Sequence, residues 1–192
     1  RGFGLASEES TEMDLFLADA DATHARGIAL ARELPKGSVL LLSGELGAGK
    51  TSLVQGLAAG LGITEAVTSP TFALAQHYSR PETPQQPVLV HLDLYRLELP
   101  EAADELFAQE EELAAESCAL LAVEWPQRLS FTPSQAWQLQ LLYCDGGRQL
   151  VISQPAAAQQ TPTPLPRRAE DRWRQRLDTP KRRKHWRIAT PA

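Results

Sequence analysis

The residues with the clearest chemistry form one short glycine-rich stretch, Gly44-Glu45-Leu46-Gly47-Ala48-Gly49-Lys50-Thr51. The stretch matches the pattern G-x-x-x-x-G-K-[ST] at every position, and this pattern binds the phosphates of nucleoside triphosphates. Its glycines allow successive backbone N–H groups to wrap around a phosphate. Lys50 is expected to reach the β- and γ-phosphates, and Thr51 to give its hydroxyl to Mg²⁺. The sequence therefore predicts a nucleoside triphosphate site that includes a magnesium ion.

Two acidic residues elsewhere in the chain are candidates for the rest of this chemistry. Asp93 and Glu124 each close an apolar run that reads as a buried strand. Phosphoryl chemistry on such a loop needs an acid from a neighbouring strand beside the metal. One of the two acids is expected to contact Mg²⁺ and the other to orient the attacking water, and the sequence does not divide these roles. Trp125 is either a core residue or a wall of the site, and His91 is either a structural histidine or shares the face of Asp93.

The elements that must position these residues alternate between apolar strands and helices. Buried strands are predicted at residues 39–42, 88–93 and 119–123, because these runs are almost wholly apolar. Helices are predicted from an N-cap at Asp21 to residue 33, over 52–61 and over 100–117, and a hairpin over 137–153. Residues 79–87 hold three prolines and are expected to form an exposed loop. This order predicts an α/β fold, a three-layer sandwich of the P-loop type with a mainly parallel central sheet and an antiparallel edge hairpin.

Charge divides the chain into an acidic body and a basic tail. Residues 1–154 hold 9 Lys and Arg against 21 Asp and Glu, whereas residues 155–192 hold 10 against 3. We predict an acidic N-terminal segment at 1–20 with one possible strand at 15–17, a P-loop domain at 21–154, and a linker with a disordered basic tail at 155–192. No apolar run approaches the roughly 18 residues of a membrane span. Cys118 and Cys144 are expected to be free core thiols, which favours a reducing, cytoplasmic location.

Four motifs in this order resemble the TsaE (YjeE) family of small bacterial ATPases. They are residues 44–51, Ser69-Pro70-Thr71-Phe72, His91-Leu92-Asp93-Leu94-Tyr95-Arg96-Leu97 and Val123-Glu124-Trp125-Pro126. The resemblance covers residues 19–153 and leaves the basic tail out. It departs mildly from the family pattern at Glu45, Ser52 and Gln127, none of which changes the core of the phosphate loop.

The resemblance implies cofactors, site residues and partners. It implies ATP and Mg²⁺ as cofactors, with Glu124 as the second Mg²⁺ position and Asp93 as a further acid near the phosphates. It implies a nucleotide-responsive switch at Ser69 and Thr71, with Ser52 in the nucleotide site and Asp145 near the adenine. Proteins of this family support the formation of N6-threonylcarbamoyladenosine in tRNA, where hydrolysis resets a complex of TsaD and TsaB. The catalytic residues expected here are thus Lys50, Asp93 and Glu124.

Three other interpretations remain open from the sequence. A small-molecule kinase would also use a P-loop, with Arg80 or Arg96 clamping the transferred phosphoryl group. A non-hydrolysing partner protein would keep ATP only as a structural ligand. The tail either binds tRNA, the ribosome or another acidic surface, or is a solvated extension.

Overall fold

A computed structural model describes residues 12–70 and 74–155. The predictions for Thr71 and for the basic tail lie outside these residues. The chain divides into units at residues 1–159 and 160–192, and all described residues belong to the first. In chain order its elements are β1 (Glu12–Leu17), α1 (Ala20–Glu33), β2 (Val39–Gly44), α2 (Lys50–Gly60), β3 (Ala75–Arg80), β4 (Thr83–Asp93), α3 (Pro100–Ser117), β5 (Leu120–Glu124), the short 3₁₀ helix η1 (Pro126–Arg128), β6 (Ala136–Cys144) and β7 (Gly147–Ser153).

One seven-stranded sheet runs through this unit in the order β1-β7-β6-β2-β5-β4-β3. The four central strands, β6, β2, β5 and β4, are parallel, while β7 and β1 at one edge and β3 at the other are antiparallel to their neighbours. The predicted α/β class, with a mainly parallel centre and an antiparallel edge hairpin, is therefore confirmed. Strand β1 pairs with β7 from Glu12↔Ser153 to Leu17↔Arg148, so this part of the acidic N-terminal segment belongs to the sheet.

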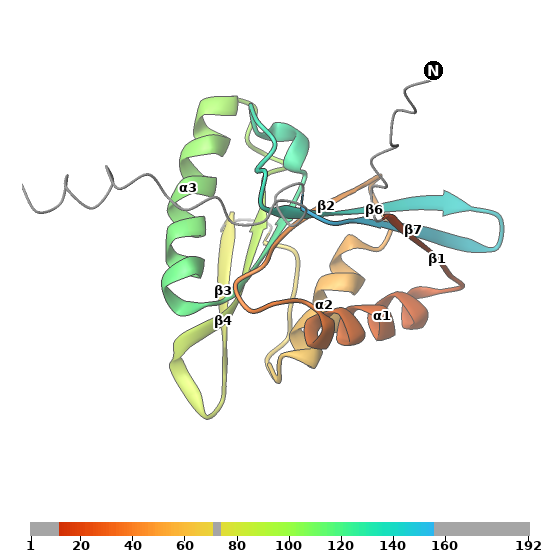
Figure 1. Ribbon diagram of the computed structural model, residues 1–192, viewed down its shortest axis with the longest axis horizontal. Helices are drawn as coiled ribbons and strands as arrows, with labels where there is room; N and C mark the ends of the chain where they lie inside the picture. Colours follow the sequence, from red (N-terminus) through yellow and green to blue (C-terminus); the bar gives the residue numbers. More distant parts are fainter. Residues whose placement is uncertain (1–11, 71–73, 156–192) are drawn as a thin grey trace, which may run out of the picture. The chain divides into compact units, whose positions relative to one another are not determined.

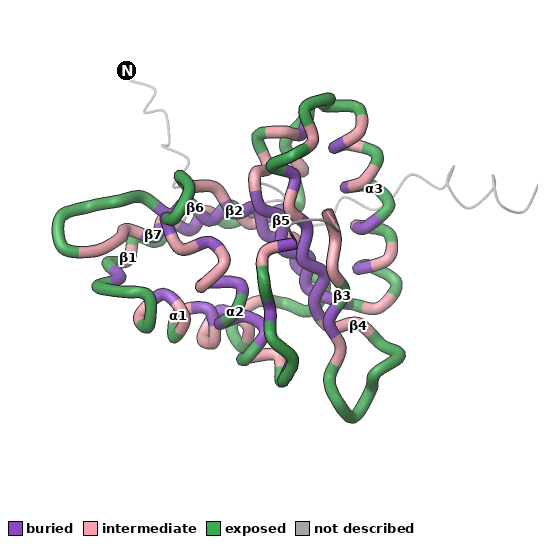
Figure 2. The backbone as a smooth tube through the Cα atoms, turned by 180° about the vertical axis from the view of Figure 1, so that it is seen from behind, coloured by how far each residue is buried: buried purple, intermediate pink, exposed green. Residues whose placement is uncertain are grey.

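Helices cover both faces of the sheet, as Figure 1 shows: α1 and α2 lie on one side and α3 on the other. The strand β2 illustrates why, because consecutive side chains of a strand point to opposite faces. Leu40 and Leu42 join the core beneath α1 and α2, whereas Leu41 joins the core beneath α3. Both cores are apolar, and Figure 2 shows the central strands as the most continuously buried part of the backbone.

The register of the central strands brings three strand ends to one level. In the pairing of β2 with β5, Leu42 lies opposite Glu124, and in the pairing of β4 with β5, Asp93 lies opposite Glu124. The loop that follows β2 leads directly to Lys50, the first residue of α2. Because the carboxyl ends of parallel strands share one edge, the loop and both acids meet there.

Three local expectations were wrong. The N-cap of α1 is Asp19, whose Oδ1 accepts the N–H of Ala22 at 2.8 Å, and Asp21 lies inside the first turn. Residues 79–87 do not form a loop throughout, because β3 and β4 extend across them as a hairpin with an exposed end (Figure 2). Cys118 and Cys144 are free, but both are exposed.

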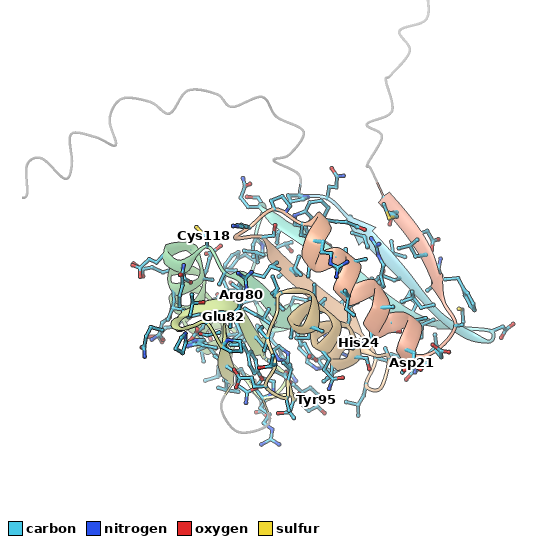
Figure 3. The ribbon with its side chains drawn as sticks, turned by 90° about the horizontal axis from the view of Figure 1, so that it is seen from below. Asp21, His24, Arg80, Glu82, Tyr95 and Cys118 are labelled. Carbon is cyan, nitrogen blue, oxygen red and sulfur yellow. The ribbon has the colours of Figure 1, made fainter. Side chains whose placement is uncertain are left out.

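The amino ends and the carboxyl ends of the parallel strands lie on different sides of the sheet. Figure 3 shows Tyr95 and Cys118 far apart, Tyr95 just after the carboxyl end of β4 and Cys118 just before the start of β5. The candidate chemistry lies at the end marked by Tyr95. No helix within the described residues combines the length and the apolar character that crossing a membrane requires.

Candidate functional site

The glycine-rich loop between β2 and α2 is held in a conformation that only glycine adopts readily. Gly44, Gly47 and Gly49 have φ angles of +148°, +79° and +107°. A Cβ at Gly44 would also lie 2.6 Å from the carbonyl oxygen of Leu141 on the neighbouring strand. The glycines of the motif therefore serve both the turn and the close approach of β6. The result is a backbone cradle at the N-terminus of α2, a position that favours anions.

Lys50 lies across this cradle. Its Nζ donates to the carbonyl oxygens of Gly44 at 2.7 Å and Glu45 at 2.9 Å, and it lies 4.7 Å from the centre of the Trp125 ring. Only 5% of the residue is exposed. Burial lowers the pKa of Lys50, while the carboxylates of Glu124 and Asp93 act in the opposite direction. Lys50 is thus a desolvated cation that phosphate oxygens would stabilise.

The two acids have different surroundings. Asp93 accepts a hydrogen bond at Oδ2 from the Ser69 hydroxyl at 3.0 Å, and at Oδ1 from the backbone N–H of Tyr95 at 2.9 Å. Glu124 is 3% exposed, and its Oε1 lies 2.9 Å from Nε2 of His91. Asp93 is therefore linked to the segment predicted as a switch, whereas Glu124 is linked to the protein interior.

These residues surround a cleft of about 390 Å³. Trp125 lies on its wall in a left-handed backbone conformation, with φ at +59°, and its ring centre is 4.8 Å from that of Tyr95. The described residues that line the cleft are Leu46, Gly47, Gly49, Lys50, Thr51, Ser52, Ser69, Pro70, Leu74, Asp93, Tyr95, Arg96, Glu124 and Trp125. Most of the predicted site residues, from four separate segments of the chain, thus meet in one cleft.

Four of the predicted site residues that the structure describes do not line the cleft. Among the described residues, Gly44, Glu45 and Ala48 belong to the loop but not to the lining of the cleft. Asp145 lies in the exposed turn between β6 and β7 and does not line it either. Glu45 contributes through its carbonyl oxygen, which accepts from Lys50.

Sequence reasoning missed two residues that support the loop from the β6–β7 hairpin. Tyr143 donates from its hydroxyl to the carbonyl oxygen of Leu46 at 3.1 Å, and Arg148 donates to that of Gly47 at 3.4 Å. The two residues face each other in the register of the hairpin. No local signal could have found them, because their contact with the loop depends on β6 pairing with β2. Tyr95, by contrast, follows Asp93 by two residues in a motif already singled out.

A metal in this cleft would need ligands beyond the acids. Thr51 and Glu124 both line the cleft, so a hydroxyl and a carboxylate are available there. Within residues 12–70 and 74–155, no group of at least three His, Cys, Asp or Glu side chains could hold a metal ion. Such a sparse oxygen set suits Mg²⁺, which usually completes its shell with water and substrate phosphates.

Comparisons with known proteins agree with this geometry. The family model "Threonylcarbamoyl adenosine biosynthesis protein TsaE" matches residues 17–150. TsaE from Synechocystis is 48% identical over 126 residues, covering 64% of this chain and 76% of the relative. TsaE from Nostoc is 44% identical over 143 residues, covering 72% and 84%.

A solved structure extends the similarity to the fold. The crystal structure of YdiB from Bacillus subtilis matches with a TM-score of 0.58 and 25% identity, over 90% of this chain and 100% of the other. The family match spans the phosphate loop, both acids and the strands that hold them. The chain therefore belongs to the TsaE family of threonylcarbamoyladenosine biosynthesis proteins.

Proposed function

We propose that this chain binds Mg·ATP in the cleft beside the phosphate loop and hydrolyses it in support of N6-threonylcarbamoyladenosine formation in tRNA. The observation that carries the proposal is the meeting of Lys50, Thr51, Asp93 and Glu124 in one cleft at the carboxyl ends of three strands. A glycine-rich turn that occurred by chance would not be expected to lie beside two acids from separate strands that end at the same level. Membership of the TsaE family supports the link to tRNA modification.

Each residue has a role that follows from its surroundings. Lys50, already desolvated, would exchange its two carbonyl partners for the β- and γ-phosphates. Thr51 and Glu124 would hold Mg²⁺, whose charge offsets that of the phosphates. Asp93, which is less buried than Glu124 and accepts a hydrogen bond from Ser69, would orient the attacking water.

The hydrogen bond between Ser69 and Asp93 supports a switch that reports the nucleotide state. A segment that is ordered by a γ-phosphate and relaxes after hydrolysis couples chemistry to a partner. Ser69 and Pro70 both line the cleft, so this segment is close enough to respond to the nucleotide. We propose that the response resets a TsaD–TsaB complex in the cytoplasm, so that this chain acts on tRNA indirectly.

The test is ATP hydrolysis by the purified chain, alone and with TsaB and TsaD. We expect slow hydrolysis alone, faster hydrolysis with the partners, and loss of both in Lys50→Ala and Glu124→Gln. Glu98→Gln, which changes an exposed acid outside the cleft lining, is the matched control and should behave like wild type.

Other outcomes would contradict the proposal in distinguishable ways. Tight ATP binding without hydrolysis under any condition would indicate a structural nucleotide. Labelled phosphate on a metabolite, rather than free phosphate, would indicate a small-molecule kinase, for which Arg96 in the cleft lining is the available clamp. A hydrolysis rate that does not change when TsaB and TsaD are added would contradict the role in resetting their complex.

A further inference from the structure

A buried histidine lies directly behind the candidate metal carboxylate. His91 is wholly buried on β4, and its Nε2 is 2.9 Å from Oε1 of Glu124 on the neighbouring strand β5. Its neighbours Val90 and Leu92 belong to the core beneath α3. Because side chains alternate along a strand, His91 shares the opposite face with Asp93, the face of the phosphate loop. The histidine therefore lies below the cleft on the same side of the sheet.

The surroundings of the ring assign its proton. Nδ1 of His91 is buried and has no hydrogen-bond partner among the described residues. A proton on Nδ1 would thus bury an unpaired N–H donor, and in the neutral ring it would also turn the Nε2 lone pair toward a carboxylate oxygen. With the proton on Nε2, the ring donates to Glu124 and leaves only an acceptor without a partner. Of the two ring nitrogens, Nε2 is therefore the one that donates, and its partner is Oε1 of Glu124.

The hydrogen bond from His91 restrains the Glu124 carboxylate, which apolar packing alone would not do. The Glu124 side chain is 4% exposed, and a buried carboxylate that is free to turn would be poorly placed to meet a ligand. The bond from His91 restrains Oε1, while Glu124 still lines the cleft. Groups that hold a metal-binding carboxylate in this way usually change metal affinity when they are removed. We infer that His91 is the positioning residue for Glu124 and sets the contribution of Mg²⁺ to nucleotide binding, an inference that rests on the proposed function.

The test compares nucleotide affinity in Mg²⁺ with affinity in EDTA, using titration calorimetry with ADP. Wild type should bind Mg·ADP more tightly than metal-free ADP. In His91→Leu, the affinity for Mg·ADP should fall by about 10- to 100-fold, while the affinity for metal-free ADP stays unchanged. His91→Gln should retain most of the gain, because its amide nitrogen reaches about as far as Nε2, whereas the shorter amide of His91→Asn should not.

His77 offers a matched control outside the cleft. Its Nε2 lies 2.6 Å from Oε2 of Glu110, a glutamate whose side chain is 10% exposed, so His77→Leu breaks a similar pair on the other face of the sheet. This variant should change thermal stability but not the effect of Mg²⁺. If His91→Leu does not fold, the comparison of the Gln and Asn variants decides the question.

Three results would overturn the inference. Equal loss of affinity with and without Mg²⁺, or a full Mg²⁺ gain in His91→Leu, would give His91 a structural role only. A wild-type chain that binds ADP equally well in Mg²⁺ and EDTA would instead refute the proposed metal site, and the inference with it. Measuring wild type first separates these failures.

Discussion

Lys50 is the residue whose burial most directly couples the stability of the fold to the site. In the folded chain the residue is 5% exposed, and its ammonium donates to two carbonyl oxygens of the loop. Desolvation of a cation opposes folding unless compensation is complete, and the direction of its pKa shift indicates that compensation is incomplete here. The chain therefore keeps a destabilising charge in the place where phosphates would bind.

The burial of Lys50 predicts a pH dependence of stability. Burial lowers the pKa of Lys50 below its ordinary 10.5, so the unfolded chain binds more protons between the folded pKa and 10.5. The contribution of Lys50 to the free energy of unfolding should therefore rise as pH rises through that window and be lost as pH falls. Denaturant unfolding from pH 8 to 10.5 should show wild type gaining stability relative to Lys50→Met. Lys36→Met, at an exposed lysine, should show no such trend; a flat or falling difference for Lys50→Met would refute the prediction.

The pair formed by Ser69 and Asp93 makes a second prediction at this scale. If the hydroxyl works through the carboxylate, their substitutions should be coupled. In a double-mutant cycle, Ser69→Ala and Asp93→Asn should each reduce partner-stimulated hydrolysis more than ATP affinity, and the double variant should be little worse than Asp93→Asn. Ser130→Ala is the matched control, because its hydroxyl also bonds an aspartate, Asp104, away from the cleft. Additive losses, or equal losses of binding and hydrolysis, would argue that the hydrogen bond is incidental.

At the scale of elements, α1 packs closely against α2, the helix that follows the phosphate loop. The helices touch through glycines: a Cβ at Gly56 would lie 2.1 Å from the carbonyl oxygen of His24, and a Cβ at Gly27 would lie 2.3 Å from that of Leu53. Both distances are far below van der Waals contact. The glycines are thus required for the helices to pack at this distance, which keeps α2 and its N-terminus against the sheet.

Gly56→Ala should therefore destabilise the chain by about 1–3 kcal/mol, the usual cost of overpacking. Helix propensity alone predicts the reverse, since alanine is favoured over glycine by about 1 kcal/mol in a helix interior. Chemical denaturation with and without ADP measures both stability and the effect on the site. Ala59→Gly, at an exposed position of the same helix, isolates the propensity effect. A gain of stability in Gly56→Ala would show that the helices can separate without cost.

The β3–β4 hairpin shows where element prediction failed and why. Pro81, Pro84 and Pro87 suggested a loop, yet β4 begins at Thr83. Pairing of β4 with β5 starts only at Leu89, so the first part of β4 has a neighbour on one side only, and its pairing with β3 shifts register there. Proline is tolerated where an N–H is not needed by a second strand. The sequence shows the prolines but not which strand positions lack a second neighbour.

The parts of the site differ in the same way. Lys50, Thr51, Asp93 and Glu124 could be named from the sequence, because each belongs to a motif or closes an apolar run whose direction is fixed by the parallel sheet. The loop contacts of Tyr143 and Arg148 join residues about a hundred positions apart, and they depend on hairpin register. The hydrogen bond between His91 and Glu124 required the relative level of two strands, which only the three-dimensional register supplies.

At the scale of the whole molecule, the distribution of charge divides the chain into an acidic part and a basic part. Residues 1–154 carry 9 basic and 21 acidic side chains, and residues 155–192 carry 10 basic and 3 acidic. An acidic body repels nucleic acid, so any direct contact with tRNA would have to come from the basic segment. Binding that depends on cations near phosphates weakens steeply with salt, because condensed counterions are released.

Filter binding of the full chain to tRNA across salt concentrations tests this division. If the basic segment neutralises up to ten phosphates, the logarithm of affinity should fall against that of salt with a slope of up to about −7 to −9. Deleting residues 156–192 should remove tRNA binding at low salt while ATP hydrolysis persists, since all the described residues that line the cleft lie before that point. Replacing Lys181, Arg182, Arg183 and Lys184 with Gln should make the slope shallower by about 3–4. Unchanged tRNA affinity after the deletion would instead show that the basic segment does not carry the contact with tRNA.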